Sequence, residues 1–295
     1  MAVYDCFQYF DEDEMVDLRL NILNNYVDYF VISESTKTHQ GKRKKINFNL
    51  NNFSKFKDKI KFIIADYKEE INFHNHIGGE SPIEQHQRNS LIEGIKKAEP
   101  NDLIILSDSD EIPDLTKIKE INKNKKFIAF CQKTFMYKLN LQNLEENNWM
   151  GSKITKMKHL SSMQELRNLK FKKYPFWRLD KRNLQIIDNG GWHFSFLQTP
   201  GQILNKVQSF SHGEYNNGEL DIKKIEEKIT NNEDIFNRGF NLKKVELNST
   251  FPDYITQNKE KFSMCSQLVL IIESGESVNS HIDPSDLLTL YTCVS

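Results

Sequence analysis

The sharpest change from hydrophobic to polar positions along the chain falls at residue 108. Residues 103–107 are short and almost wholly apolar, which predicts a strand buried on both faces of a mostly parallel sheet. Three carboxylates, Asp108, Asp110 and Glu111, follow at once. Because like charges repel one another and resist desolvation, this cluster needs a cation or hydrogen-bond donors beside it. The alternative interpretation is a solvated turn, since Asp is common in turns and Pro113 would stop a strand anyway.

Hydrophobic spacing near the N-terminus predicts a β-α-β unit, the building block of a parallel sheet. Residues 2–10 favour a strand, and Asp11 with Glu14 can form a capping box at the start of a helix. The apolar face of that helix would contain Met15, Leu18 and Ile22. Residues 29–33 favour a second strand, which places Glu34 at its carboxyl end. Ligands of open α/β sheets bind at these ends, so such carboxylates are candidate ligand contacts.

A third strand is expected at residues 61–65, and a helix is expected from Ser81 to about Ala98. Ser81 is the predicted N-cap of this helix, and Glu84 completes its capping box. Glu84 and Arg88 are four residues apart and therefore share a helix face. An Arg held there fits recognition of a phosphate or a nucleobase. The alternative is an intrahelical ion pair on the surface.

The hydrophobic pattern is weaker in the middle of the chain. It favours strands at residues 127–131 and 134–141, and another at 184–187. Residues 142–173 are rich in Lys, Asn and Ser and lack a clear period. We interpret them as a mobile lid or an acceptor-binding loop.

An aromatic strand is predicted at residues 192–197, after the turn signal that runs from Asp188 to Gly191. Alternation along this strand places His193 and Ser195 on one face and the aromatic side chains on the other. Because the aromatic face must be buried, His193 is expected to face away from the core, as a ligand in a cleft would.

Two helices are expected after the aromatic strand. The first begins at the capping signal Thr199–Gln202, and its buried face would contain Ile203, Val207 and Phe210. The second lies near residues 219–230, and its apolar positions are Ile222, Ile225 and Ile229. We expect residues 1–262 to form a single domain and residues 263–295 to form a C-terminal tail of unknown role.

Composition and charge narrow the class of protein. The chain has 295 residues, of which 38% are hydrophobic, enough for one large domain or two small ones. Its net charge of -1 gives no overall field that would favour nucleic acid or membranes as partners. The four Cys are scattered and are expected to be reduced thiols. No apolar run approaches the length of a membrane span, so we expect a soluble, cytoplasmic protein.

Six groups of residues stand in the order seen in glycosyltransferase family 17, and the chain resembles that family over residues 2–260. The groups are Tyr4-Asp5-Cys6-Phe7 with Leu18-Arg19-Leu20-Asn21, Val31-Ile32-Ser33-Glu34-Ser35, Gln87-Arg88-Asn89, Ser107-Asp108-Ser109-Asp110-Glu111-Ile112-Pro113, Gly191-Trp192-His193-Phe194-Ser195 and Ser211-His212-Gly213-Glu214. Each motif alone is weak, and the ordered set is specific.

The resemblance implies an α/β fold of the GT-A type, with a Rossmann-like, mostly parallel central sheet flanked by helices. It also implies a nucleotide-sugar donor, with a UDP-sugar favoured, a glycan or glycoconjugate acceptor, a Mn²⁺ or Mg²⁺ ion, and inversion at the anomeric carbon. The family includes the animal enzyme that adds the bisecting N-acetylglucosamine to N-glycans, which makes N-acetylglucosamine a candidate sugar.

The same resemblance implies metal ligands. Asp110 would be the first ligand, and Asp108 would contact the metal or the ribose. GT-A enzymes often supply a later His to the metal; His193 resembles that position, and His212 is its rival.

Other roles follow from the mechanism that the resemblance implies. Glu34 and Arg88 would hold the nucleoside and its phosphates. An inverting transfer needs a carboxylate base to deprotonate the acceptor hydroxyl. Asp188 is the first candidate for this base, and Glu214 is the second.

Two further function classes stay open at this point. An aspartate-based phosphohydrolase would use the motif at residues 108–110 as its nucleophile, although the continuation Glu111-Ile112-Pro113 argues against it. A non-catalytic sugar-binding module is the other class, and the intact acidic motif with Arg88 argues against it.

Overall fold

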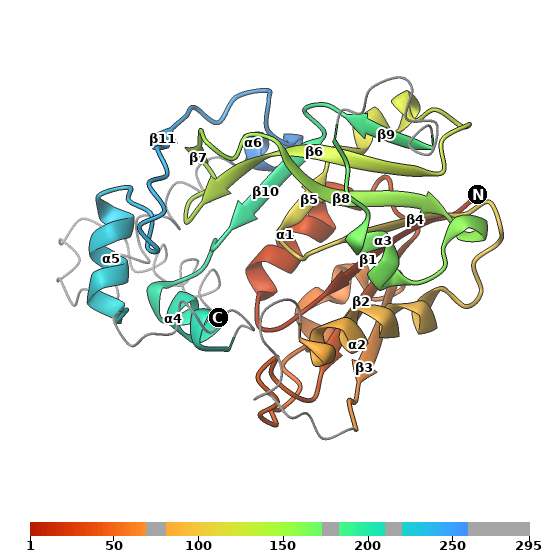
Figure 1. Cartoon of the computed structure of the whole chain (residues 1–295), viewed down its shortest axis with the longest axis horizontal. Coiled ribbons are helices and arrows are strands. Elements are labelled where there is room, and N and C mark those ends of the chain that lie inside the picture. Colours follow the sequence, from red (N-terminus) through yellow and green to blue (C-terminus); the bar gives the residue numbers. More distant parts are fainter. Residues whose placement is uncertain (69–80, 173–182, 210–219, 259–295) are drawn as a thin grey trace.

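The N-terminal half of the central sheet consists of four parallel strands in the order β3-β2-β1-β4. A computed structural model describes residues 1–68, 81–172, 183–209 and 220–258 (Figure 1). The strands are β1 (Val3–Gln8), β2 (Tyr29–Ser35), β3 (Ile60–Ala65) and β4 (Leu103–Ser107). All five residues of β4 are buried, as its apolar sequence predicts.

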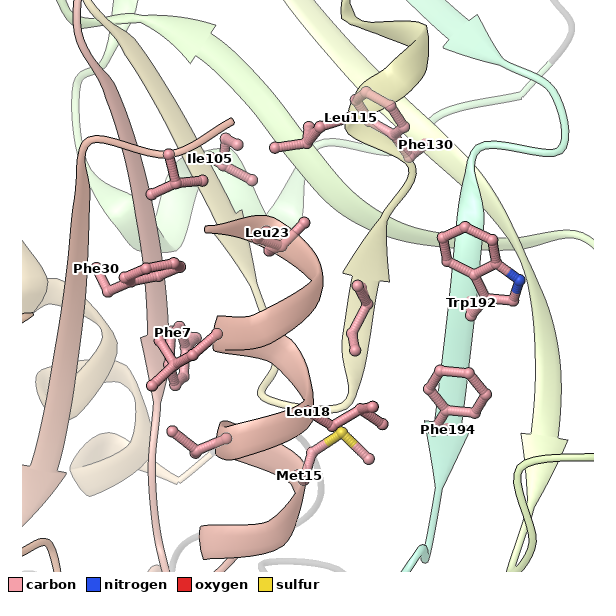
Figure 2. Packing of buried hydrophobic residues seen from close by; sticks show 14 of the residues in the cluster. Phe7, Met15, Leu18, Leu23, Phe30, Ile105, Leu115, Phe130, Trp192 and Phe194 are labelled. Atoms are coloured by element: carbon pink, nitrogen blue, oxygen red, sulfur yellow. The ribbon is translucent and has the colours of Figure 1, made fainter. Parts of the chain in front are cut away.

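Helix α1 (Asp13–Leu23) crosses from β1 to β2 and packs against the sheet. Figure 2 shows it between β1 and β2 on one side and the strand that carries Trp192 and Phe194 on the other. The predicted capping box is wrong, because Glu12 holds the N-cap position and makes no side-chain cap hydrogen bond. Asp11 instead accepts hydrogen bonds from later residues, described below.

Helix α2 (Pro82–Ser90) confirms the predicted N-cap, since the hydroxyl of Ser81 accepts a hydrogen bond from the backbone N–H of Glu84. The helix is shorter than predicted. It tightens into the 3₁₀ helix η3 (Leu91–Ile95), whose Gly94 packs against β2. Another 3₁₀ helix, η1 (Leu50–Phe56), precedes β3.

The second half of the sheet departs from the sequence-based expectation at two places. Strand β6 (Phe127–Met136) is continuous with an irregularity between Ala129 and Cys131, so the two predicted strands are one. Strand β8 (Trp149–Lys156) lies inside the segment interpreted as a lid and pairs antiparallel with both β4 and β6. That lid interpretation is wrong. The local sequence pattern predicts no strand here, but hydrogen bonds from the two neighbouring strands stabilise one.

Short elements connect these strands. Strand β5 (Glu111–Pro113) and η4 (Leu115–Glu120) follow the acidic motif. Strand β7 (Leu141–Asn143) pairs with β6, and η5 (Met157–His159) and α3 (Met163–Asn168) follow β8.

Strand β9 (Leu184–Ile187) and the turn after it confirm the sequence interpretation. Strand β10 (Gly191–Ser195) then runs antiparallel to β5 and parallel to β6. Gly191 has φ 144°, and a Cβ there would lie 2.2 Å from the carbonyl oxygen of Ile112, so the close approach to β5 requires glycine. The predicted alternation is confirmed, because Trp192 and Phe194 are buried while His193 is partly exposed.

The chain continues through α4 (Pro200–Ser209), α5 (Ile222–Thr230), β11 (Leu242–Lys244) and α6 (Asp253–Gln257). The capping signal of α4 is confirmed by reciprocal hydrogen bonds between Thr199 and Gln202. Ile225 and Ile229 are buried on α5 as predicted, but Ile222 in its first turn is 43% exposed. Phe210 lies outside the described residues.

The sheet follows the path β11-β7-β6-β8-β4-β1-β2-β3, with β5, β9 and β10 attached beside it (Figure 1). This mixed, mostly parallel sheet flanked by helices confirms the expected α/β class. Within the described ranges no helix is long and apolar enough to cross a membrane. Cys6 and Cys131 are buried free thiols, as expected.

Candidate active site

The acidic motif lies at the carboxyl end of β4, beside the carboxyl end of its parallel neighbour β1. Glu111 is the structural member of this motif. It is 1% exposed, and its carboxylate accepts hydrogen bonds from the backbone N–H of Asp108 at 3.0 Å and from Nε1 of Trp149 at 2.7 Å. The solvated-turn interpretation is therefore wrong, because the motif runs into the buried strand β5.

Asp108 faces two arginines. Its Oδ2 lies 2.7 Å from Nη2 of Arg167 on α3, and its Oδ1 lies 3.8 Å from Nη2 of Arg88 on α2. Burial by itself raises the pKa of the Asp108 carboxyl, but the two guanidinium groups outweigh it and hold that pKa below its usual value. Asp108 is therefore a carboxylate at neutral pH, with its charge already matched by protein cations.

Arg88 is buried rather than part of a surface ion pair. It is 1% exposed, donates to Glu84 at 2.8 Å and donates to Oε1 of Gln164 at 2.7 Å. The surface alternative is wrong, because α3 covers this face of α2. Nearby, Lys153 on β8 donates to the carbonyl of Arg167, and burial together with that guanidinium lowers the pKa of Lys153 to about 8. Arg88, Arg167 and Lys153 form a cationic group beside Asp108.

Asp110 has a different set of neighbours from Asp108. Its Oδ1 lies 3.8 Å from Nε2 of His193, and its Oδ2 lies 4.0 Å from Nζ of Lys206 on α4. The same ammonium lies 3.5 Å from Glu12. Burial lowers the pKa of Lys206, but Glu12 and Asp110 outweigh that effect and raise it. The two aspartates therefore point to two different halves of the site.

His193 is held by packing. Its ring stacks on Trp149 with centroids 4.7 Å apart and planes 22° from parallel. Its Nδ1 lies 3.5 Å from the hydroxyl of Thr134 on β6. Because Trp149 also donates to Glu111, one side chain links the imidazole to the acidic motif.

The donor set fits a divalent ion at Asp110. Carboxylate oxygens and imidazole nitrogens are ligands that Mn²⁺ accepts, and Asp110 and His193 present one of each. Among the described residues, no group of three or more His, Cys, Asp or Glu side chains forms a closed metal site. A metal ion held here would keep positions open for substrate oxygens, as catalytic ions do.

Glu34 is buried at the carboxyl end of β2, as its sequence position predicts. Its carboxylate accepts hydrogen bonds from the backbone N–H groups of Asn47 at 2.8 Å and Phe48 at 2.9 Å, and it pairs with Lys44. In this structure Glu34 therefore fixes the loop that carries Lys44 to Phe48.

The structure does not bring Asp188 to this cluster. Asp188 is exposed in the turn before β10, and its carbonyl accepts a hydrogen bond from Lys117 on η4. Strands β5 and β10 are antiparallel, so the start of β10 lies beside Pro113 and its far end lies beside Asp110. Asp188 is thus at the opposite end of this ladder. The other two candidates, His212 and Glu214, lie outside the described residues.

Asp11 is a carboxylate that the sequence did not single out for chemistry. It follows β1 and accepts hydrogen bonds from Gln198 at 3.2 Å and from Asn205 of α4 at 3.4 Å. Burial and the neighbouring Glu12 raise the pKa of Asp11 to about 6. In the sequence, Asp11 is only the first of four consecutive acidic residues, Asp11 to Glu14, after an apolar strand.

A glycosyltransferase family profile matches nearly the whole chain, so the protein is a glycosyltransferase, an enzyme that takes a nucleotide-sugar donor and a glycan acceptor. The chain belongs to glycosyltransferase family 17, whose profile matches residues 1–264. This confirms the family resemblance and the GT-A type of fold, and the phosphohydrolase alternative is not retained. No curated protein sequence matches the chain.

Several solved structures are similar in fold. HddC from Yersinia pseudotuberculosis complexed with GMP-PN is 12% identical, with a TM-score of 0.34 over 64% of this chain and 90% of that one. A glycosyltransferase involved in the glycosylation of the major capsid of PBCV-1 is 9% identical, with a TM-score of 0.30 over 64% and 82%. The glycosyltransferase GlyE of Streptococcus pneumoniae TIGR4 is 13% identical, with a TM-score of 0.29 over 64% and 46%.

Proposed function

We propose that the chain is a metal-dependent, inverting glycosyltransferase that uses a nucleoside diphosphate sugar, with a UDP-sugar as the favoured donor. The observation that carries this proposal is that the two aspartates of the acidic motif have different charged neighbours. Asp108 faces Arg88 and Arg167, whereas Asp110 faces His193. An anionic donor needs cations along its phosphates and a divalent ion at its leaving group, and the two halves supply matching chemistry.

Asp110 and His193 would hold the metal ion, whose contribution when bound is to neutralise the diphosphate leaving group as a Lewis acid. Lys206 lies within 4.0 Å of Asp110 and adds a protein cation on the same side. Arg88 and Arg167 would orient the donor, because planar guanidinium groups can bind phosphate oxygens in pairs. Glu34 would act indirectly, by fixing the loop that holds Asn47 and Phe48.

The acceptor hydroxyl must lose a proton to a base during inversion. Glu214, a sequence-based candidate, keeps that role in the proposal. Asp11 is its rival, because its raised pKa of about 6 suits a proton acceptor near neutral pH and it lies next to Glu12 and α4. N-acetylglucosamine is the candidate sugar through the family, and the acceptor is a glycan or glycoconjugate.

The test is a panel of nucleotide sugars incubated with the protein, with and without Mn²⁺, and read by release of nucleoside diphosphate. The expected result is that one UDP-sugar is consumed only when the divalent ion is present. Proton NMR of the product should show the anomeric configuration opposite to that of the donor. Turnover that continues unchanged in a chelator, or a product with retained configuration, would contradict the proposal.

A second panel distinguishes the candidate bases. Asp11→Asn and Glu214→Gln each remove one carboxylate with little change in shape. The true base should lose turnover by at least about a hundredfold, in line with the contribution of general base catalysis, while donor affinity is retained. The other variant should keep most of its activity. If both variants turn over normally, neither carboxylate is the base.

A further inference from the structure

A fully buried ion pair lies directly behind the acidic motif. Asp5 on β1 and Arg19 on α1 are both 0% exposed. The contact is bidentate, with Nε of Arg19 2.7 Å from one carboxylate oxygen and Nη2 2.6 Å from the other. A buried pair is weak evidence for stability, since desolvation of the two charges offsets their attraction. The presence of this ion pair inside the main hydrophobic cluster is therefore not explained by stability alone.

The guanidinium uses its remaining nitrogen on the acidic motif itself. Nη1 of Arg19 donates to the carbonyl oxygens of Glu111 at 2.6 Å, Asp108 at 3.3 Å and Ser109 at 3.4 Å. The carbonyl of Asp110 accepts from the backbone N–H of Phe194 at 2.9 Å. Every backbone carbonyl from residue 108 to residue 111 is thus held, and three of the four are held by one side chain.

The position of Arg19 explains how it reaches this loop. Leu18 and Leu20 beside it are buried, and its guanidinium carbon lies 4.8 Å from the centre of the Phe7 ring. Helix α1 packs between β1 and β10 (Figure 2). The Arg19 side chain is 0% exposed. The guanidinium has N–H donors on three nitrogens, so it can bind a carboxylate and three carbonyls together. A lysine ammonium carries its three donors on one atom and cannot replace it.

We propose that Asp5 and Arg19 form a positioning pair that fixes the backbone of residues 108–111 from behind and so sets where the Asp108 and Asp110 carboxylates point. The proposal rests on the proposed function for its effect on the reaction. Its structural part, the immobilised loop, does not depend on which reaction is catalysed. Neither residue touches the substrate.

A double variant separates this role from a stabilising one. Asp5→Leu with Arg19→Met replaces the pair by apolar side chains, an exchange that in buried pairs is often neutral or stabilising. Because the exchange also removes the donor from three backbone carbonyls, we expect its melting temperature to fall modestly, and by less than that of Asp5→Asn. We also expect kcat/KM to fall by at least about a hundredfold, as misplacement of a site by about an ångström does. Asp5→Asn is the converse control, since it leaves the carbonyl contacts of Arg19 but unbalances its charge; stability should fall more than kcat.

Amide hydrogen exchange gives a readout that needs no activity. The backbone N–H groups of Glu111 and Phe194 donate to carbonyls of the motif. In the double variant their exchange should speed up, while exchange in β1 and β2 stays as in the wild type. If the double variant fails to fold, Arg19→Lys is tested in the same two assays, because it keeps the positive charge but lacks the planar guanidinium. A folded variant with unchanged exchange and kcat/KM within about threefold of wild type would overturn the positioning role, whatever the donor. Wild-type turnover that does not need a divalent ion would overturn the proposed function instead.

Discussion

Nη2 of Arg167 lies 2.7 Å from Oδ2 of Asp108, so the first aspartate of the acidic motif is paired with a protein cation. Arg167→Met should leave the carboxylate without its closest cation and remove a phosphate-binding group. We expect the KM for the nucleotide sugar to rise by about tenfold or more, which corresponds to roughly 1.4 kcal/mol. Arg238→Met is the matched control, because that guanidinium pairs with Asp234 instead. An unchanged KM in the Arg167 variant would mean that this arginine only neutralises Asp108.

His193 should decide the metal requirement of the enzyme. An imidazole nitrogen can ligate Mn²⁺, so His193→Ala removes a proposed ligand. We expect the Mn²⁺ concentration for half-maximal activity to rise by at least about tenfold, or roughly 1.4 kcal/mol. His212→Ala should do less, and His159→Ala on η5 is the control for loss of an unrelated imidazole. A metal titration that ranks His212 above His193 would move the ligand to His212.

Much of this site was predictable from the sequence, because short local patterns of apolar and polar residues mark it. An apolar run that ends in carboxylates marks β4 and its motif, and two-residue alternation places His193 toward the site. Arg19 was missed as a site residue because it stands between Leu18 and Leu20, where a sequence pattern cannot distinguish a buried charge from an exposed one. Strand β8 was missed because its hydrogen bonds come from β4 and β6, far away in the chain.

Asp188 illustrates a further limit of sequence reasoning. Its turn was predicted, and the strand after it forms as predicted. Whether that turn lies at the same end of the sheet as Asp110 depends on the pairing of β10 with β5, which no local pattern encodes. The cations around Asp108 come from α2, β8 and α3, and only their tertiary packing brings them together.

Asp11 should make stability depend on pH. Its folded-state pKa of about 6 lies above the ordinary value of 3.8, so the folded state binds this proton more tightly than the unfolded state does. The resulting stabilisation is complete below 3.8 and is lost as the pH rises through about 6. Relative to Asp11→Asn, which does not ionise there, the wild type should therefore lose melting temperature between about pH 4 and pH 8. Asp17→Asn on α1 is the control, and parallel curves for the wild type and the Asp11 variant would contradict this prediction.

Gly94 tests how closely η3 packs on the sheet. A Cβ at this position would lie 2.3 Å from Cγ1 of Val31, so Gly94→Ala forces one of the two elements to shift. We expect the free energy of unfolding to fall by about 1–3 kcal/mol, the usual cost of overpacking a core. Gly201→Ala is the matched control, because a Cβ there meets no atom within 4 Å and alanine favours the helix. Denaturant unfolding of the two variants measures both effects, and equal stabilities would contradict the packing described here.

In the proposed function, Asp110 holds the divalent ion through which the donor diphosphate binds. Isothermal calorimetry of UDP binding, with and without Mn²⁺, tests it on the wild type and on Asp110→Ala. The variant should fold normally, because Glu12 still pairs with Lys206 at 3.5 Å when the Asp110 carboxylate, 4.0 Å from the same ammonium, is removed. We predict that the wild type binds UDP far more tightly with Mn²⁺ and that Asp110→Ala loses this metal-dependent gain. UDP affinity in Mn²⁺ that is the same for the variant as for the wild type would contradict the account.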